Sequence, residues 1–226
     1  MKETNDNSKP NSKVKVKICC IKSKEEANLA IGCGAFAIGL VGQMPSGPGI
    51  IDDKLGQEIA QCIDKDISSF LLTSKIKSID IIAHYNLVKT STIQIVDEVE
   101  VSVYEEIRMA LPNINLVQVI HVMDDTAITQ ALKVAEFVDY ILLDSGNPNL
   151  KIKELGGTGK VHNWQISKVI RETVDVPVFL AGGLNSQNVS SATDIVKPYG
   201  VDVCSGVRIN GRLDRRKIED FFKALS

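Results

Sequence analysis

Short runs rich in Val, Ile and Leu alternate along this chain with longer segments in which apolar residues recur at helical spacing. Most of the short runs are nearly continuous in apolar residues, as expected for parallel strands that are covered on both faces. We expect strands at residues 14–20, 35–41, 69–73, 92–96, 116–121, 138–144, 176–181 and 201–205.

The segments between these runs have the pattern of amphipathic helices. The clearest of them are residues 24–31, 53–63, 75–85, 125–135, 164–173 and 214–225. The fourth strand–helix unit is the weakest prediction, because the segment between Asp97 and Pro112 is poorly patterned. Eight such units follow one another without an internal linker, and this cadence predicts a single (β/α)8 TIM barrel over residues 14–226.

An open, doubly wound α/β sheet is the alternative fold. It usually has fewer strands and carries a glycine fingerprint in the first turn between strand and helix. Here that turn reads Cys19-Cys20-Ile21-Lys22, and the glycines gather after the sixth to eighth predicted strands. This distribution favours the closed barrel.

Composition and charge favour some classes of protein and some cellular compartments over others. The 226 residues are 44% hydrophobic, enough for one core, and the 26 basic and 28 acidic residues are spread along the chain, unlike the clustered basic patch of a nucleic-acid-binding protein. Five cysteines without CxxC spacing favour reduced thiols in the cytoplasm over a disulfide framework or a zinc site. Residues 1–13 are polar and predict a disordered tail, not a secretory signal. No stretch approaches the roughly 20 apolar residues of a membrane helix, so we expect no membrane or nucleic-acid partner.

Two predicted strands end in side chains that can move protons. Lys17 and Cys19 alternate in the first strand and should project to the same side, where the ammonium would favour the thiolate form of Cys19. A small buried hydrophobe is the alternative role for this cysteine. Asp144 ends an apolar strand, where a carboxyl group is either a general acid or the cap of the Asp144-Ser145-Gly146 turn.

Other polar residues leave more than one interpretation open. Asp202 should share a side with Cys204 in the last strand, as a substrate contact or as part of an ion pair. His121 closes the fifth strand and is a further candidate ligand contact, whereas His84 is expected to be structural or exposed. Cys20, Cys33 and Cys62 are expected to pack in the core.

Glycines follow the last three strands. The segments 181–185 and 204–207 come after the seventh and eighth strands, where barrel loops frequently bind phosphate through backbone N–H groups. The run Gly156–Gly159 predicts a mobile lid or a flexible turn.

From about Val14 to Leu225 the chain resembles phosphoribosylanthranilate isomerases of tryptophan biosynthesis. The most specific segments are Val16-Lys17-Ile18-Cys19, Leu142-Leu143-Asp144-Ser145, Gly156-Gly157-Thr158-Gly159-Lys160 with Trp164, Phe179-Leu180-Ala181-Gly182-Gly183-Leu184 with Asn188-Val189, and Val201-Asp202-Val203 with Ser205-Gly206-Val207.

This resemblance implies a reaction and assigns residues to it. The reaction is an Amadori rearrangement of an N-phosphoribosyl arylamine without metal or organic cofactor, with Cys19 as general base and Asp144 as general acid. Main-chain N–H groups of Gly182, Gly183, Ser205 and Gly206 would hold the substrate phosphate. Lys17, Asp202 and Gly157 are expected as further substrate contacts. The small phosphorylated substrate is the expected partner of a cytoplasmic monomer or homodimer.

Several positions depart from the family pattern and suggest a divergent branch. Cys20 replaces the glycine after the catalytic cysteine, and residues 44–49 lack the arginine that holds the anthranilate carboxylate. The Gln-Leu-His-Gly run of the fourth strand reads Gln94-Ile95-Val96-Asp97, Asn163 replaces an aspartate, and Arg208 replaces a glutamate. Two alternatives therefore stay open: an aldose–ketose isomerase for another phosphoribosyl amine, and a phosphate-ligand binding barrel without catalysis.

Overall fold

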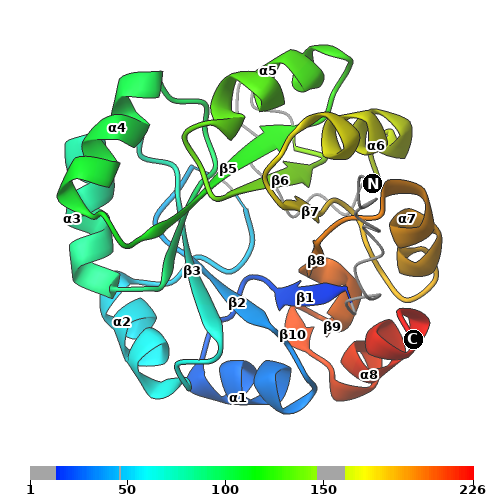
Figure 1. Ribbon diagram of the computed structural model, residues 1–226. Helices are drawn as coiled ribbons and strands as arrows, with labels where there is room; N and C mark the ends of the chain where they lie inside the picture. The colour runs from blue at the N-terminus through cyan, green and yellow to red at the C-terminus, as the bar shows by residue number, and fades with distance from the viewer. Residues whose placement is uncertain (1–13, 46, 147–160) are drawn as a thin grey trace, which may run out of the picture.

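Eight parallel strands pair in chain order and close into a barrel, because β1 also pairs with β8 (Figure 1). The computed structural model describes residues 14–45, 47–146 and 161–226. The strands are β1 (Lys15–Ile18), β2 (Ala37–Val41), β3 (Ser68–Thr73), β4 (Thr92–Ile95), β5 (Asn115–His121), β6 (Tyr140–Asp144), β7 (Val178–Leu180) and β8 (Gly200–Val203). The predicted barrel fold is confirmed. The expected tail, residues 1–13, lies outside the described residues.

An outer ring of helices surrounds the barrel (Figure 1). These helices are α1 (Lys24–Gly32), α2 (Asp53–Cys62), α3 (Ser78–Val88), α4 (Val101–Ala110), α5 (Thr126–Ala135), α6 (Trp164–Thr173), α7 (Val189–Val196) and α8 (Arg215–Ala224). In the described ranges, no helix combines the length and the apolar character that crossing a bilayer requires.

Two helices differ from what the pattern predicts. The third begins at Ser78, three residues later than predicted, because Lys75 is held in the preceding turn, where its N–H donates to Thr73 Oγ1 at 3.3 Å. It continues to Val88, which is fully buried against α2. The poorly patterned fourth segment does form a helix, since Val103, Tyr104 and Ile107 make one buried face.

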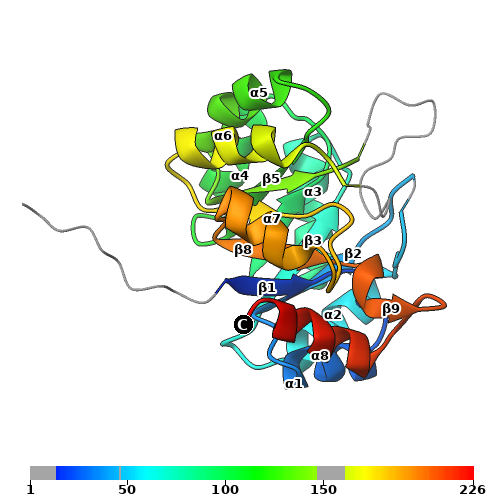
Figure 2. The same cartoon turned by 90° about the vertical axis from the view of Figure 1, so that its right-hand side faces the viewer.

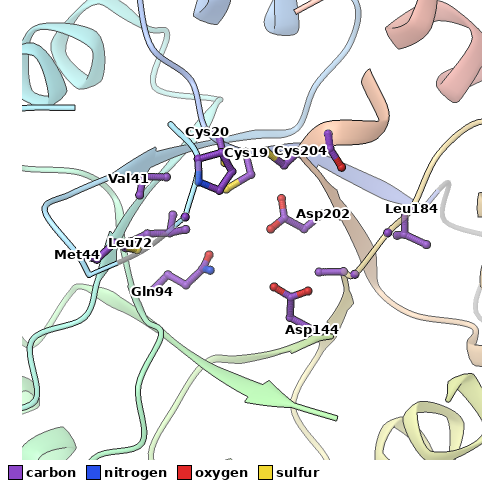
Figure 3. A pocket seen from close by; sticks show the side chains of 16 residues that line it. Cys19, Cys20, Val41, Met44, Leu72, Gln94, Asp144, Leu184, Asp202 and Cys204 are labelled. Atoms are coloured by element: carbon purple, nitrogen blue, oxygen red, sulfur yellow. The ribbon is translucent and has the colours of Figure 1, made fainter. Parts of the chain in front are cut away.

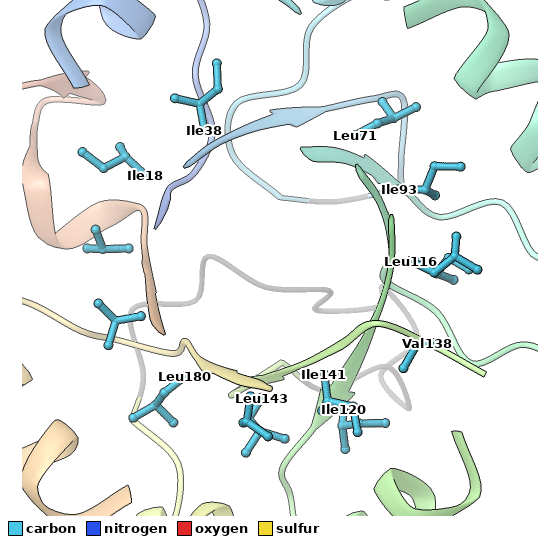
Figure 4. Packing of buried hydrophobic residues seen from close by; sticks show 14 of the residues in the cluster. Ile18, Ile38, Leu71, Ile93, Leu116, Ile120, Val138, Ile141, Leu143 and Leu180 are labelled. Carbon is cyan, nitrogen blue, oxygen red and sulfur yellow. The ribbon is translucent and has the colours of Figure 1, made fainter. Parts of the chain in front are cut away.

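Apolar side chains pack in two separate layers. Alternate strand residues point outward to the helices, as Figure 4 shows for Ile18, Ile38 and Leu71. The other set fills the barrel, where the rings of Phe70 and Phe179 meet edge to face with centroids 6.0 Å apart. These rings lie near the beginnings of β3 and β7, so they close the amino-terminal end of the barrel and leave the carboxyl-terminal end for a pocket.

A small hairpin follows β8 and was not predicted from the sequence. A short 3-10 helix, η1 (Ser205–Val207), leads into β9 (Arg208–Ile209), which pairs antiparallel with β10 (Arg212–Leu213). Asn210 and Gly211 between them both have positive φ, 50° and 76°, the backbone that a tight two-residue turn requires. In the side view, β9 lies at the end of the barrel opposite the one at which the chain enters β1 (Figure 2).

Candidate active site

A pocket opens at the carboxyl ends of the strands. Its walls come from nearly the whole barrel and consist of Cys19, Cys20, Val41, Met44, Gly47, Pro48, Leu72, Gln94, Asp144, Ala181, Gly182, Gly183, Leu184, Asp202, Cys204 and Ser205. Figure 3 shows Cys19 and Asp144 on opposite sides of this space, with Asp202 between them in that view. This is the end of a TIM barrel at which active sites are built.

Cys19 occupies the first position after β1. Its N–H donates to the carbonyl of Val203 at 2.9 Å and extends the pairing of β1 with β8 by one residue. The side chain has room because the facing residue on β2 is Gly39. A Cβ atom at Gly39 would lie 2.7 Å from the sulfur of Cys19 and 3.3 Å from Nζ of Lys17. The thiol and the ammonium therefore flank the same point of the barrel wall.

Lys17 and Asp202 form an ion pair inside the barrel. Nζ lies 2.7 Å from Oδ2, and the two residues are also paired in the β1–β8 register. Burial disfavours the ammonium, but the charge and hydrogen bond of Asp202 outweigh it and raise the pKa of Lys17. Lys17 is 0% exposed and is not among the described residues that line the pocket, whereas its partner Asp202 is.

Asp144 ends β6 with its carboxyl group in the pocket wall. Its Oδ1 accepts the N–H of Ser145 at 2.7 Å, so the group stabilises the turn and faces the pocket at once. Burial raises the pKa of Asp144, while this hydrogen bond and the neighbouring His121 act in the opposite direction. A carboxyl group with a raised pKa is suited to donate a proton near neutral pH.

Two of the polar pocket residues, Gln94 and Cys20, were not predicted as site residues. Gln94 lies on β4 between two outward-facing isoleucines and lines the pocket. A glutamine in an otherwise apolar strand is the sequence signal that could have identified it as a pocket residue. Cys20 lines the pocket with a positive φ of 63°. The thiols of Cys19 and Cys204, together with burial, raise its pKa well above the usual value, so Cys20 stays protonated.

Two buried polar atoms in the pocket region have no hydrogen-bond partner among the described residues. Gln94 Oε1 and Asp202 Oδ1 are buried, and neither accepts a hydrogen bond in the described part of the chain. Buried acceptors are normally paired. Both residues line the pocket, so these oxygens are suited to the hydroxyl groups of a bound ligand.

The glycine loops form the wall beside β7 and β8. Gly182 and Gly183 have φ of 83° and 62°, and among the described residues neither backbone N–H donates a hydrogen bond. A Cβ atom on Gly206 would collide with the carbonyl oxygen of Leu184, so glycine is required for the two loops to approach. Free N–H groups in such loops are suited to bind an anion.

The remaining candidates lie elsewhere. Gly157 and the rest of its glycine run are outside the described residues. His121 Nε2 donates to the carbonyl of Val96 at 3.0 Å, and His121 lines a separate cavity between α4 and α5. His84 is buried between Thr73 and Asp53, a structural position. Of the cysteines expected in the core, Cys33 is half-buried and Cys62 is exposed, because each lies at the end of a helix.

In the described ranges, no cationic side chain lines this pocket and no cluster of side chains is arranged to bind a metal ion. Neither lysine nor arginine appears among its described lining residues, and Arg208 is held away from it by Glu26. The described residues contain no group of three or more His, Cys, Asp or Glu side chains arranged to hold a metal ion.

The closed parallel barrel and its pocket place the protein in the class of TIM-barrel enzymes. Comparison with known proteins then defines the family. The family model described as N-(5′-phosphoribosyl)anthranilate (PRA) isomerase matches residues 74–224. A relative from Methanosarcina mazei, N-(5′-phosphoribosyl)anthranilate isomerase 2, is 35% identical over 92% of this chain and 92% of its own length. The chain belongs to the PRA isomerase family.

Solved structures agree with this assignment. The phosphoribosyl anthranilate isomerase of Thermotoga maritima superposes with a TM-score of 0.80 and 29% identity, covering 94% of this chain and 98% of that one. A phosphoribosyl anthranilate isomerase in complex with reduced 1-(o-carboxyphenylamino)-1-deoxyribulose 5-phosphate gives a TM-score of 0.77 at 26% identity, with the same coverage.

Replacing Lys17 by methionine should destabilise the fold strongly. The change leaves Asp202 buried without its cation, a loss of about 3–5 kcal/mol in the free energy of unfolding. Lys24→Met is the matched control, because Lys24 pairs with Glu58 at 2.9 Å on the surface, and it should change stability little. Denaturant unfolding of both variants measures the difference, and equal losses would contradict the buried pair as a structural element.

Replacing Asp144 by asparagine should stabilise the protein, and more so at higher pH. Burial raises the folded-state pKa of Asp144 above its ordinary value of 3.8, so ionisation costs stability as the pH rises through the folded-state pKa. Asparagine carries no charge at any pH. We expect the variant's melting temperature to exceed that of the wild type by a few degrees at about pH 8 and by less at about pH 4. A difference that does not change with pH would contradict the raised pKa.

Proposed function

We propose that this protein isomerises N-(5′-phosphoribosyl)anthranilate to 1-(o-carboxyphenylamino)-1-deoxyribulose 5-phosphate, with Cys19 as general base and Asp144 as general acid. The observation that carries the proposal is that this thiol and this carboxyl group face one pocket from opposite sides, beside two glycine loops. Membership of the PRA isomerase family supports the same reaction.

The phosphate group anchors the substrate at the loops after β7 and β8. The unoccupied N–H groups of Gly182 and Gly183 donate to phosphate oxygens, and the N–H groups of Ser205 and Gly206 approach from the other loop. Backbone donors are fixed before binding, so little conformational freedom is lost when the phosphate arrives. The sugar then extends from this cradle across the pocket.

Asp144 starts the reaction as an acid. Burial raises its pKa, which favours the protonated form, and the proton passes to the ring oxygen of the ribose. The bond between C1 and the ring oxygen breaks, and the nitrogen lone pair forms a protonated Schiff base with C1. The phosphate cradle holds the opened chain in place.

Cys19 continues as a base. Its thiolate takes the proton from C2, and the electrons of that bond form a C1–C2 double bond while the Schiff base returns to an amine. The resulting enolamine becomes the aminoketone when C1 gains a proton and the C2 hydroxyl loses one.

Gln94 and Asp202 position the sugar. Their unpaired oxygens, Oε1 and Oδ1, lie in the pocket region and accept hydrogen bonds from ribose hydroxyl groups. Lys17 holds Asp202 in place at 2.7 Å and opposes the rise that burial causes in the pKa of Asp202, so it contributes to binding through that residue. The side chains of Val41, Met44 and Leu72 form an apolar wall that suits an aromatic ring.

A second candidate substrate follows from the charge of the pocket. No lysine or arginine is among the described lining residues, so none of these residues offers a cation to the carboxylate of anthranilate. This favours testing phosphoribosyl amines that lack a carboxylate. A higher kcat/KM for such an amine than for the anthranilate compound would support the second candidate.

Location and assembly remain predictions. We expect a cytoplasmic protein that works as a monomer or a homodimer. Gel filtration with light scattering would distinguish the two forms of assembly, and a larger oligomer would contradict both.

Substituting the proposed base should abolish most turnover. The loss of fluorescence of the anthranilate substrate reports the reaction, and Cys19→Ala should lower kcat by about 10²–10⁴-fold, the usual contribution of a general base. Cys62→Ala removes an exposed thiol and should leave kcat unchanged. Full activity in Cys19→Ala would exclude Cys19 as the base, and no turnover by folded wild-type protein would exclude the proposed reaction.

A methyl group in the phosphate cradle should weaken substrate binding. Gly182→Ala forces a side chain onto a φ of 83° and places its Cβ 2.9 Å from Nδ1 of His162. Displacement of the loop removes charge-assisted hydrogen bonds, so KM should rise about ten-fold or more. Gly34→Ala carries the same kind of strain at a φ of 101° but lies against Phe222, and should lower stability without changing KM. Equal KM values in both variants would contradict the cradle.

A further inference from the structure

The loop that carries Cys19 has an unusual backbone. Cys20, the next residue, has a φ of 63°, a region that favours glycine and that other residues seldom occupy. A Cβ atom at Gly49 would lie 2.5 Å from the Cβ of Cys20, so the neighbouring loop leaves this side chain little space. A conformation of this kind persists when the surrounding structure holds it.

Arg208 supplies such a restraint. Its Nη2 donates to the carbonyl of Cys20 at 2.6 Å and to the carbonyl of Cys19 at 3.2 Å. One planar guanidinium group thus binds the carbonyls of the two peptide groups that flank the Cα atom of Cys20. The first of these peptide groups directly follows Cys19, whose side chain lines the pocket.

The guanidinium is itself held by Glu26. Nη1 lies 2.8 Å from Oε1 and Nη2 lies 3.2 Å from Oε2, a two-point contact in which the side chains are 7% and 14% exposed. Burial opposes ionisation of Arg208, and Glu26 outweighs it and raises the pKa of Arg208.

The same carboxylate ties three segments together. Glu26 lies in the first turn of α1 and also accepts the N–H of Lys22 at 3.0 Å and the N–H of Leu213 at 3.2 Å. Arg208 adds a bond from Nη1 to the carbonyl of Gly211 at 3.1 Å, and Lys22 Nζ donates to that carbonyl at 2.9 Å. The hairpin of β9 and β10 is therefore fastened to the loop after β1.

Arg208 does not line the pocket, so it has no place among the groups that touch the substrate. We propose that Arg208, held by Glu26, is a positioning residue that sets the direction of the Cys19 thiol by fixing the carbonyls of Cys19 and Cys20. This role rests on the proposed function of Cys19 as base. Because Arg208 belongs to β9, the β9–β10 hairpin would then contribute to catalysis.

Loss of Arg208 should affect kcat far more than KM. Without the guanidinium, the thiol should lie off the line of the substrate C2–H bond, while the phosphate cradle stays intact. A misplacement of about 1 Å lowers a rate by up to about 100-fold. Arg208→Gln should thus lower kcat by about 10–100-fold and change KM by less than about two-fold.

An isotope effect separates positioning from general loss of stability. With substrate deuterated at C2, the proton transfer to Cys19 becomes more rate-limiting in Arg208→Gln, so the isotope effect on kcat should exceed that of the wild type. Arg208→Lys keeps the charge beside Glu26 but lacks the planar fork, and should recover only part of kcat. Arg215→Gln, which removes an exposed arginine, is the control and should match the wild type in every parameter.

A second measurement does not need the substrate. Iodoacetamide alkylation of Cys19, followed by peptide mass spectrometry, should proceed at a different rate in folded Arg208→Lys and Arg208→Gln than in the wild type and Arg215→Gln. If Arg208→Gln does not fold, Arg208→Lys carries the test. Wild-type kcat, isotope effect and alkylation rate in a folded Arg208 variant would overturn the proposal. A folded wild type without turnover would instead overturn the proposed function, and the role of Arg208 with it.

Discussion

The pairing of β1 with β8 is the constraint on which the site depends. It closes the barrel, and its register places Lys17 opposite Asp202 and brings Cys19 onto the carbonyl of Val203. The ion pair at 2.7 Å lies within this register, so the strand pairing and the electrostatics support each other. One residue beyond the strand, the chain turns sharply at Cys20, where backbone conformation and Arg208 decide how the thiol enters the pocket.

Two carboxyl groups in one pocket differ because their partners differ. Burial raises the pKa of Asp202, but the ammonium of Lys17, 2.7 Å from Oδ2, acts in the opposite direction and favours the anion. Asp144 has no bonded cation among the described residues, and burial raises its pKa toward the range of a proton donor. The buried Lys17 therefore supports the charge of Asp202, while Asp144 has no comparable partner among the described residues.

Much of the barrel was predictable because its strands are covered on both faces and read as continuous apolar runs. The strand ends then identified Cys19 and Asp144, and the glycines after β7 and β8 identified the loops of the pocket. Gln94 was missed because its position was compared with a family motif and not with its apolar neighbours in the strand. Strand alternation also places Lys17 one layer below Cys19, in agreement with its complete burial beneath the pocket. The hairpin at Asn210-Gly211 carries a recognisable turn sequence, but its strands are only two residues long.

The most direct test is a crystal structure with the reduced product analogue bound. The account predicts the phosphate on the N–H groups of Gly182, Gly183, Ser205 and Gly206, and C2 about 3–3.5 Å from the sulfur of Cys19. The oxygen that derives from the ribose ring should lie within hydrogen-bonding distance of Asp144. A ligand whose phosphate binds elsewhere, or whose C2 faces away from Cys19, would contradict it.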